Sequence, residues 1–184
     1  MKIWKLDCDV EKYENLTWKE QLNIDEIQSF DGRKKLKDWK PIQVKRMYDR
    51  PYSNTPGFSA HIPVFDNNAI MLLNDLIEGN AEILPLSSED GDFYAINVTN
   101  ILDCIIYNKS SYKTFRDGKR IMKFTKYAFD LDKIKGIHLF KISDEPLNVE
   151  CQVKLNTFSQ ISRIELNTLF YPWFLLLTFR IEHY

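Results

Sequence analysis

The sequence predicts an α+β fold, built from a mainly antiparallel sheet with a few short helices. Short segments in which apolar and polar residues alternate recur along the chain, and turn residues separate them, as is typical of paired strands. The clearest helical pattern, an apolar stripe, lies in residues 67–78. The length of 184 residues fits one domain, residues 1–184.

The N-terminal part, residues 1–60, is predicted to be rich in strands. Trp4 and Leu6 alternate with polar neighbours, and Asp31 and Gly32 form a turn signal after an apolar segment. The expected elements are a strand at residues 2–7, a polar connector with some helical turn at 8–24, strands at 27–30 and 42–47, and a loop at 50–60.

The helix at residues 67–78 carries signals at both ends. Asp66 is a suitable N-cap, because its carboxylate can accept the N–H groups of the first turn. Phe65 and Ile70 fall at the positions of a hydrophobic staple, and Gly79 can end the helix with a positive φ.

The rest of the chain again favours strands. Asp117 and Gly118 indicate a two-residue hairpin turn. The expected strands are residues 82–86, 93–98, 112–116, 119–127 and 137–142, with residues 101–107 read as strand or helix. Residues 143–184 are expected to form a strand, a helix at 155–166 and a final strand in the apolar segment at 169–184.

Composition excludes several classes of protein. The net charge of −1 argues against a protein that binds nucleic acid through its overall charge. The N-terminus has no apolar signal region and the longest apolar run is too short to span a bilayer, so we expect a cytoplasmic protein without membrane partners. The sequence has no phosphate-binding, metal-ligand or nucleophile motif, so we expect no enzyme, no cofactor and no metal site.

Charge is nevertheless distributed in blocks. Residues 51–108 contain eight acidic residues and no Lys or Arg. This block could attract a basic partner, or the basic blocks at 33–50 and 109–126 could pack beside it and neutralise it. The candidate partner-binding residues are Asp75, Glu78, Glu82, Glu89, Asp90 and Asp92.

The basic block at residues 109–126 has two interpretations of its own. Its cations alternate with Tyr112, Phe115 and Phe124, a composition found in nucleic-acid-binding surfaces. Strands with one solvated face produce the same composition without any ligand. The block therefore supports an alternative function, a module that binds a small ligand or nucleic acid.

Residues 61–142 resemble immunity protein family eleven of bacterial polymorphic toxin systems. The most specific part is the sequence Glu-Ile-Leu-Pro-Leu at 82–86 with Tyr94, Asn97, Val98 and Thr99 downstream. The resemblance implies a non-catalytic protein that binds and blocks a cognate toxin encoded nearby. Residues 1–60 match the family weakly, and an open sheet edge would also allow a homodimer.

Overall fold

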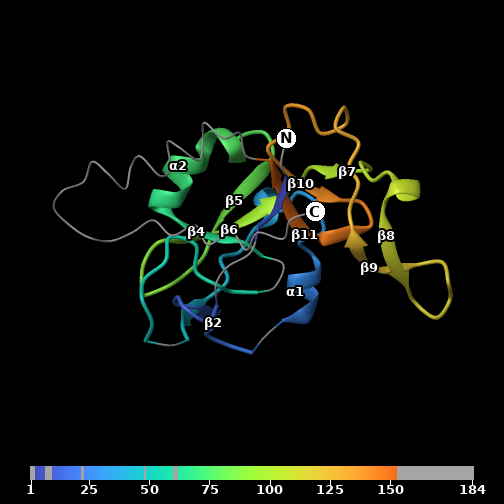
Figure 1. The fold of residues 1–184 in the computed structure, drawn as a ribbon. Helices are drawn as coiled ribbons and strands as arrows, with labels where there is room; N and C mark the ends of the chain where they lie inside the picture. Colours follow the sequence, from blue (N-terminus) through green and yellow to red (C-terminus); the bar gives the residue numbers. More distant parts are fainter. Residues whose placement is uncertain (1–2, 7–9, 22, 48, 60–61, 153–184) are drawn as a thin grey trace.

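A computed structural model describes residues 3–6, 10–21, 23–47, 49–59 and 62–152 (Figure 1). The helix expected at 155–166 and the apolar segment at 169–184 lie outside these residues. The strands are β1 Ile3–Lys5, β2 Leu16–Trp18, β3 Val44–Arg46, β4 Val64–Asp66, β5 Ala81–Pro85, β6 Phe93–Val98, β7 Ile101–Leu102, β8 Ser111–Thr114, β9 Ile121–Lys126, β10 Leu139–Ile142 and β11 Glu145–Gln152. The helices are α1 Ile24–Gln28 and α2 Asn67–Ile77, with short 3₁₀ helices η1 Leu36–Asp38 and η2 Tyr107–Lys109.

The strands within the described residues form four sheets, and antiparallel pairing dominates. The order is β4-β6-β5 in the three-stranded sheet and β1-β11-β10-β7 in the four-stranded sheet, where only β10 and β7 run parallel. Strands β2 and β3 pair with each other, and so do β8 and β9. The structure confirms the predicted α+β class with a mainly antiparallel sheet.

Helix α2 covers one face of the β4-β6-β5 sheet. The Asp66 carboxylate accepts the Ala69 N–H at 2.7 Å, so the predicted N-cap is confirmed. Gly79 follows the helix with φ of 72°, a conformation that favours glycine. The apolar stripe of α2 packs against the sheet, and the buried members of this cluster are Phe65, Ala69, Leu73, Ile77, Ile96, Val98 and Leu139.

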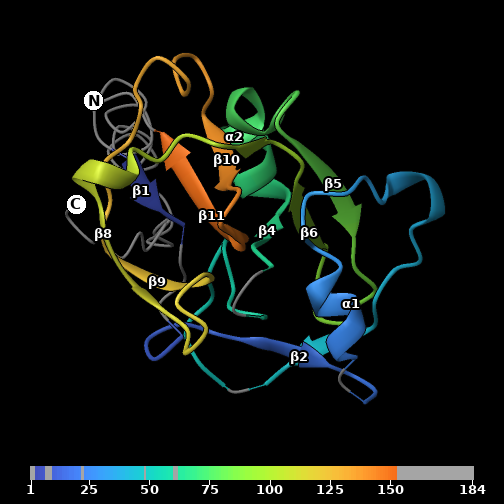
Figure 2. The same cartoon turned by 90° about the vertical axis from the view of Figure 1, so that its right-hand side faces the viewer.

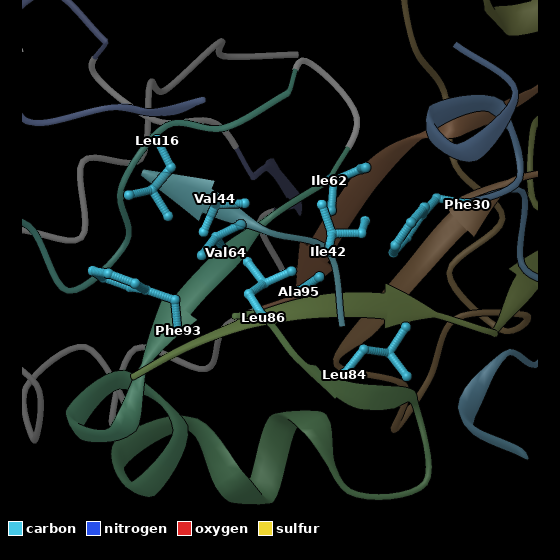
Figure 3. Packing of buried hydrophobic residues seen from close by; sticks show 10 residues of the cluster. All are labelled: Leu16, Phe30, Ile42, Val44, Ile62, Val64, Leu84, Leu86, Phe93 and Ala95. Atoms are coloured by element: carbon cyan, nitrogen blue, oxygen red, sulfur yellow. The ribbon is translucent and has the colours of Figure 1, made fainter. Parts of the chain in front are cut away.

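The opposite face of the same sheet holds a second apolar cluster (Figure 3). Alternation along β6 separates the two clusters, because Phe93 and Ala95 point to this face whereas Ile96 and Val98 point toward α2. Strands β2 and β3 cover this cluster, whose buried members are Leu16, Phe30, Ile42, Val44, Ile62, Val64, Leu84, Leu86, Phe93 and Ala95.

A third apolar cluster joins the β8–β9 hairpin to β10. Figure 2 shows this hairpin at the left of the molecule, on the other side from β5. Phe124 is the member that the hairpin contributes, and it is only 4% exposed. The buried members are Cys104, Ile105, Phe124, Ile134, Phe140 and Ile142. The base of the hairpin is therefore fixed to the four-stranded sheet.

Three expectations about local structure were wrong. Residues 24–28 form helix α1, where a strand was expected from residue 27, because Asn23 accepts the N–H groups of Asp25 and Glu26 and caps a helical turn. The connector at 8–24 contains strand β2, which pairing with β3 stabilises. The expected two-residue turn is a longer loop, because the Phe115 N–H donates to the Arg120 carbonyl.

Candidate partner-binding surfaces

The six acidic candidates do not form one surface. Asp75 and Glu78 lie exposed near the C-terminal end of α2. The loop between β5 and β6, which carries three of the other candidates, adjoins the N-terminus of α2. An 11-residue helix is about 16 Å long, so Asp75 and Glu78 are distant from that loop. Neither carboxylate forms an ion pair with any residue that the structure describes.

Glu82 lies on the other face of the sheet from α2. Its carboxylate accepts the backbone N–H of Lys35 at 2.7 Å and the side-chain amide of Asn97 at 2.9 Å. The same amide donates to the Arg33 carbonyl at 2.8 Å. Glu82 therefore anchors the segment before η1 to the sheet through Oε2, which accepts both hydrogen bonds.

Glu89, Asp90 and Asp92 lie together in the loop between β5 and β6. Glu89 forms an ion pair of 2.7 Å with Lys19, and this hydrogen bond raises the pKa of Lys19. Asp90 accepts the Arg46 backbone N–H at 3.0 Å. The loop is thus held against the β2–β3 sheet, although its side chains remain exposed.

The basic block at 33–50 compensates the acidic block in part. It contributes two backbone N–H groups, those of Lys35 and Arg46, rather than two side-chain cations. The cation that contacts Glu89 is Lys19, which lies outside that block. The contacts described for the basic block at 109–126 join it to Asp117, within the block, and to Glu145, not to the acidic candidates.

A buried polar cluster, which the sequence did not indicate, connects the loop at 50–57 to the start of α2. Besides capping the helix, Asp66 accepts the Tyr52 hydroxyl and the Asn54 amide, the latter at 2.6 Å. Burial and the hydrogen bond to Asp66 raise the pKa of Tyr52 above its usual range. The hydrogen bonds from Tyr52 and Asn54 to Asp66 position the loop against the start of α2.

Glu14, which is fully buried, extends this cluster toward β3. It accepts the Ser53 N–H at 3.2 Å and lies 2.9 Å from Arg46 Nε. Burial raises the pKa of Glu14, whereas the Ser53 hydrogen bond and the Arg46 charge lower it. Glu14 is buried but the Arg46 side chain is 41% exposed, so a half-buried ion pair connects the loop at 50–57 to β3.

The β8–β9 hairpin is largely exposed in the described part of the chain. Every residue from 111 to 120 is exposed. Its exposed apolar side chains are Tyr112, Phe115 and Met122, with Tyr107 at the adjoining η2. The basic residues of the hairpin and the adjoining η2 are Lys109, Lys113, Arg116, Lys119, Arg120, Lys123 and Lys126.

Two features of the described residues bear on catalysis and on membranes. No group of three or more His, Cys, Asp or Glu side chains in the described ranges is placed to hold a metal ion. Among the helices that the structure describes, none combines the length and the apolar character needed to cross a membrane.

The model of the Immunity protein family (Imm11) matches residues 83–157. The match begins in β5, includes the β8–β9 hairpin and continues beyond β11. It confirms the resemblance inferred from the sequence, although residues 61–82 lie outside the matched range. No curated protein matches the chain.

Proposed function

Because residues 83–157 match the immunity protein family, we propose that this protein binds and neutralises a cognate bacterial toxin by direct contact, without catalysis. The family match is the observation that carries the proposal. The toxin is expected to be encoded nearby, as is typical of polymorphic toxin systems. The proposed location is the cytoplasm, where the protein would protect the producing cell.

We place the toxin contacts on two separate exposed acidic groups, one at the C-terminal end of α2 and one in the loop between β5 and β6. The residues proposed to contact the toxin are Asp75, Glu78, Glu89, Asp90 and Asp92. Their side chains are exposed, so a basic partner can reach them, whereas Glu82 is occupied by contacts within the chain. An acidic surface speeds association with a basic partner through long-range attraction.

A growth-rescue assay tests the function. The large open reading frame beside the gene is expressed in a bacterial host with and without this protein, and the two products are tested for co-purification. Rescue together with a stable complex supports the proposal. Toxicity without rescue or complex formation refutes it. Sedimentation of the purified protein alone checks the further expectation of a homodimer.

Charge reversal tests the acidic surface separately. The side chains of Asp75 and Glu78 make no described hydrogen bond or ion pair, so the variant D75K/E78K removes no described contact. We expect association with the toxin to slow about tenfold at low salt, with a weaker dependence on ionic strength. The control D38K/D132K makes the same charge change at exposed residues outside the five proposed contacts. Equal association rates for both variants would locate the contact on another surface.

A further inference from the structure

The β8–β9 hairpin carries positive charge that the described residues do not compensate. Lys113 and Lys123 are directly paired across the two strands, and like charges in such positions destabilise a hairpin. The hairpin's described ion pair joins Arg120 to Asp117, at 2.7 Å. The remaining cations have no described ion-pair partner, so the hairpin is suited to bind negative charge.

The same hairpin exposes aromatic residues of the kind that dominate protein interfaces. Phe115 and Tyr112 are each 42% exposed, near the tip and along β8 respectively. The Arg120 guanidinium lies 5.0 Å from the centre of the Phe115 ring. Prevention of aggregation could by itself explain lysines on an edge strand, but it does not explain the exposed aromatic rings. Aromatic residues next to arginine are typical of interface hot spots.

The hairpin is also hydrogen-bonded at its tip and near its base. At its tip, Asp117 accepts the backbone N–H groups of Lys119 and Arg120 as well as Arg120 Nε, and these bonds lower the pKa of Asp117. At its base, the Glu145 carboxylate accepts the Phe124 N–H and, at 2.7 Å, the Tyr127 hydroxyl. A surface that is already ordered loses little conformational entropy on binding.

We propose that the β8–β9 hairpin is a docking arm for an acidic surface on a folded partner protein. This inference goes beyond the proposed toxin contact, because Figure 1 shows the hairpin on the opposite side of the molecule from α2. Residues 109–126 carry +6 in a chain whose total is −1, so the remaining residues carry −7. Exposed rings beside Arg120 favour a protein surface over nucleic acid as the occupant of the arm.

Binding of a soluble glutamate–tyrosine copolymer tests the acidic preference, with an oligothymidine single strand of similar charge as the competing probe. Fluorescence anisotropy measures the affinity of the full chain for each. We expect the copolymer to bind more tightly than the oligonucleotide, with an affinity that falls as salt rises. Failure to bind the copolymer, or tighter binding of the oligonucleotide, overturns the proposal.

The variant K113E/K119E/K123E tests the location, because all three side chains are exposed. We expect copolymer affinity to fall at least about tenfold. The matched control K34E/K37E/K40E makes the same charge change in the other basic block, also at exposed residues, and is expected to retain binding. Equal losses in the two variants would show that net charge alone governs binding and would overturn the proposal.

Phe115 provides a test that charge alone cannot satisfy. We expect F115S to lose about fivefold in copolymer affinity and F115W to restore it, because a ring at this position supplies contact area next to Arg120. Circular dichroism and the thermal midpoint confirm that each variant is folded. A folded F115S variant with unchanged affinity would show that the Phe115 ring does not contact the partner and would contradict its role in the proposed arm.

Discussion

Replacement of Lys141 by methionine should stabilise the protein at neutral pH. Lys141 lies within β10 and is 1% exposed. Its ammonium group donates to the Phe30 carbonyl, just beyond the C-terminus of α1, where a cation interacts favourably with the helix dipole. Burial lowers the pKa of Lys141 to about 8, although the Asp31 charge acts in the opposite direction.

The lowered pKa gives the magnitude. A decrease from 10.5 to about 8 means that the folded state holds the charged lysine at an expense of about 3 kcal/mol relative to the unfolded chain. Methionine has a similar length and removes that charge, but it leaves the Phe30 carbonyl without this donor, which costs about 1 kcal/mol. We therefore expect K141M to raise the free energy of unfolding by about 2 kcal/mol at pH 7.

The pH dependence distinguishes this explanation from improved packing. Below pH 8 both states bind the lysine proton, so the full penalty is present. Between about 8 and 10.5 the unfolded chain still binds the proton and the folded protein does not, so stability contributed by this residue rises with pH. We expect this rise in the wild-type protein and its absence in K141M.

Urea denaturation at pH 7, 8, 9 and 10 measures both effects. K45M serves as the control, because Lys45 also lies in a strand but is exposed. Its free energy of unfolding should stay within about 0.5 kcal/mol of the wild-type value. A K141M protein that is less stable at pH 7, or that keeps the wild-type rise between pH 8 and 10, would refute the reasoning.

Two further substitutions should separate structural carboxylates from surface ones. D66A removes the cap of α2 and leaves the Tyr52 hydroxyl and the Asn54 amide without their acceptor, so urea denaturation should show a loss of about 3 kcal/mol. D75A, on the exposed side of the same helix, should change the free energy of unfolding by less than about 0.5 kcal/mol, and comparable losses would contradict this distinction. The free energy of unfolding should fall by about 2 kcal/mol in E82A and by less in E82Q, because glutamine keeps an oxygen acceptor for the two N–H donors. An E82A protein as stable as the wild type would show that those hydrogen bonds do not contribute to stability.

Elements with strong local signals were predictable from the sequence. Helix α2 has an N-cap, an apolar stripe and a terminal glycine within one short segment, and the β5–β6 hairpin has two alternating strands around a polar loop. Helix α1 lacked such redundancy, because five residues cannot display a helical period. Burial of Phe30, together with the Asn23 cap, determines its conformation.

The candidate site was predictable only in part, because its acidic residues were grouped by their order in the chain. Strand parity could have separated Glu82 from the others. Leu84 and Leu86 are buried on the face away from α2, and alternation places Glu82 on that same face. Buried charges such as Glu14 and Lys141 had no equivalent signal, since their burial depends on segments distant in the sequence.

Folding changes which charges remain available to a partner. The sequence places negative charge in residues 51–108 and positive charge on both sides of them, which suggested mutual neutralisation. In the structure, the carboxylates of Glu82 and Asp90 accept hydrogen bonds from backbone N–H groups, so these contacts do not pair them with side-chain cations. Exposed carboxylates therefore persist on α2, while Lys113 and Lys123 persist on the distant hairpin. Such a charge separation can orient the protein in the field of a charged partner, and the two sets of charge-reversal variants should then alter association with partners of opposite sign.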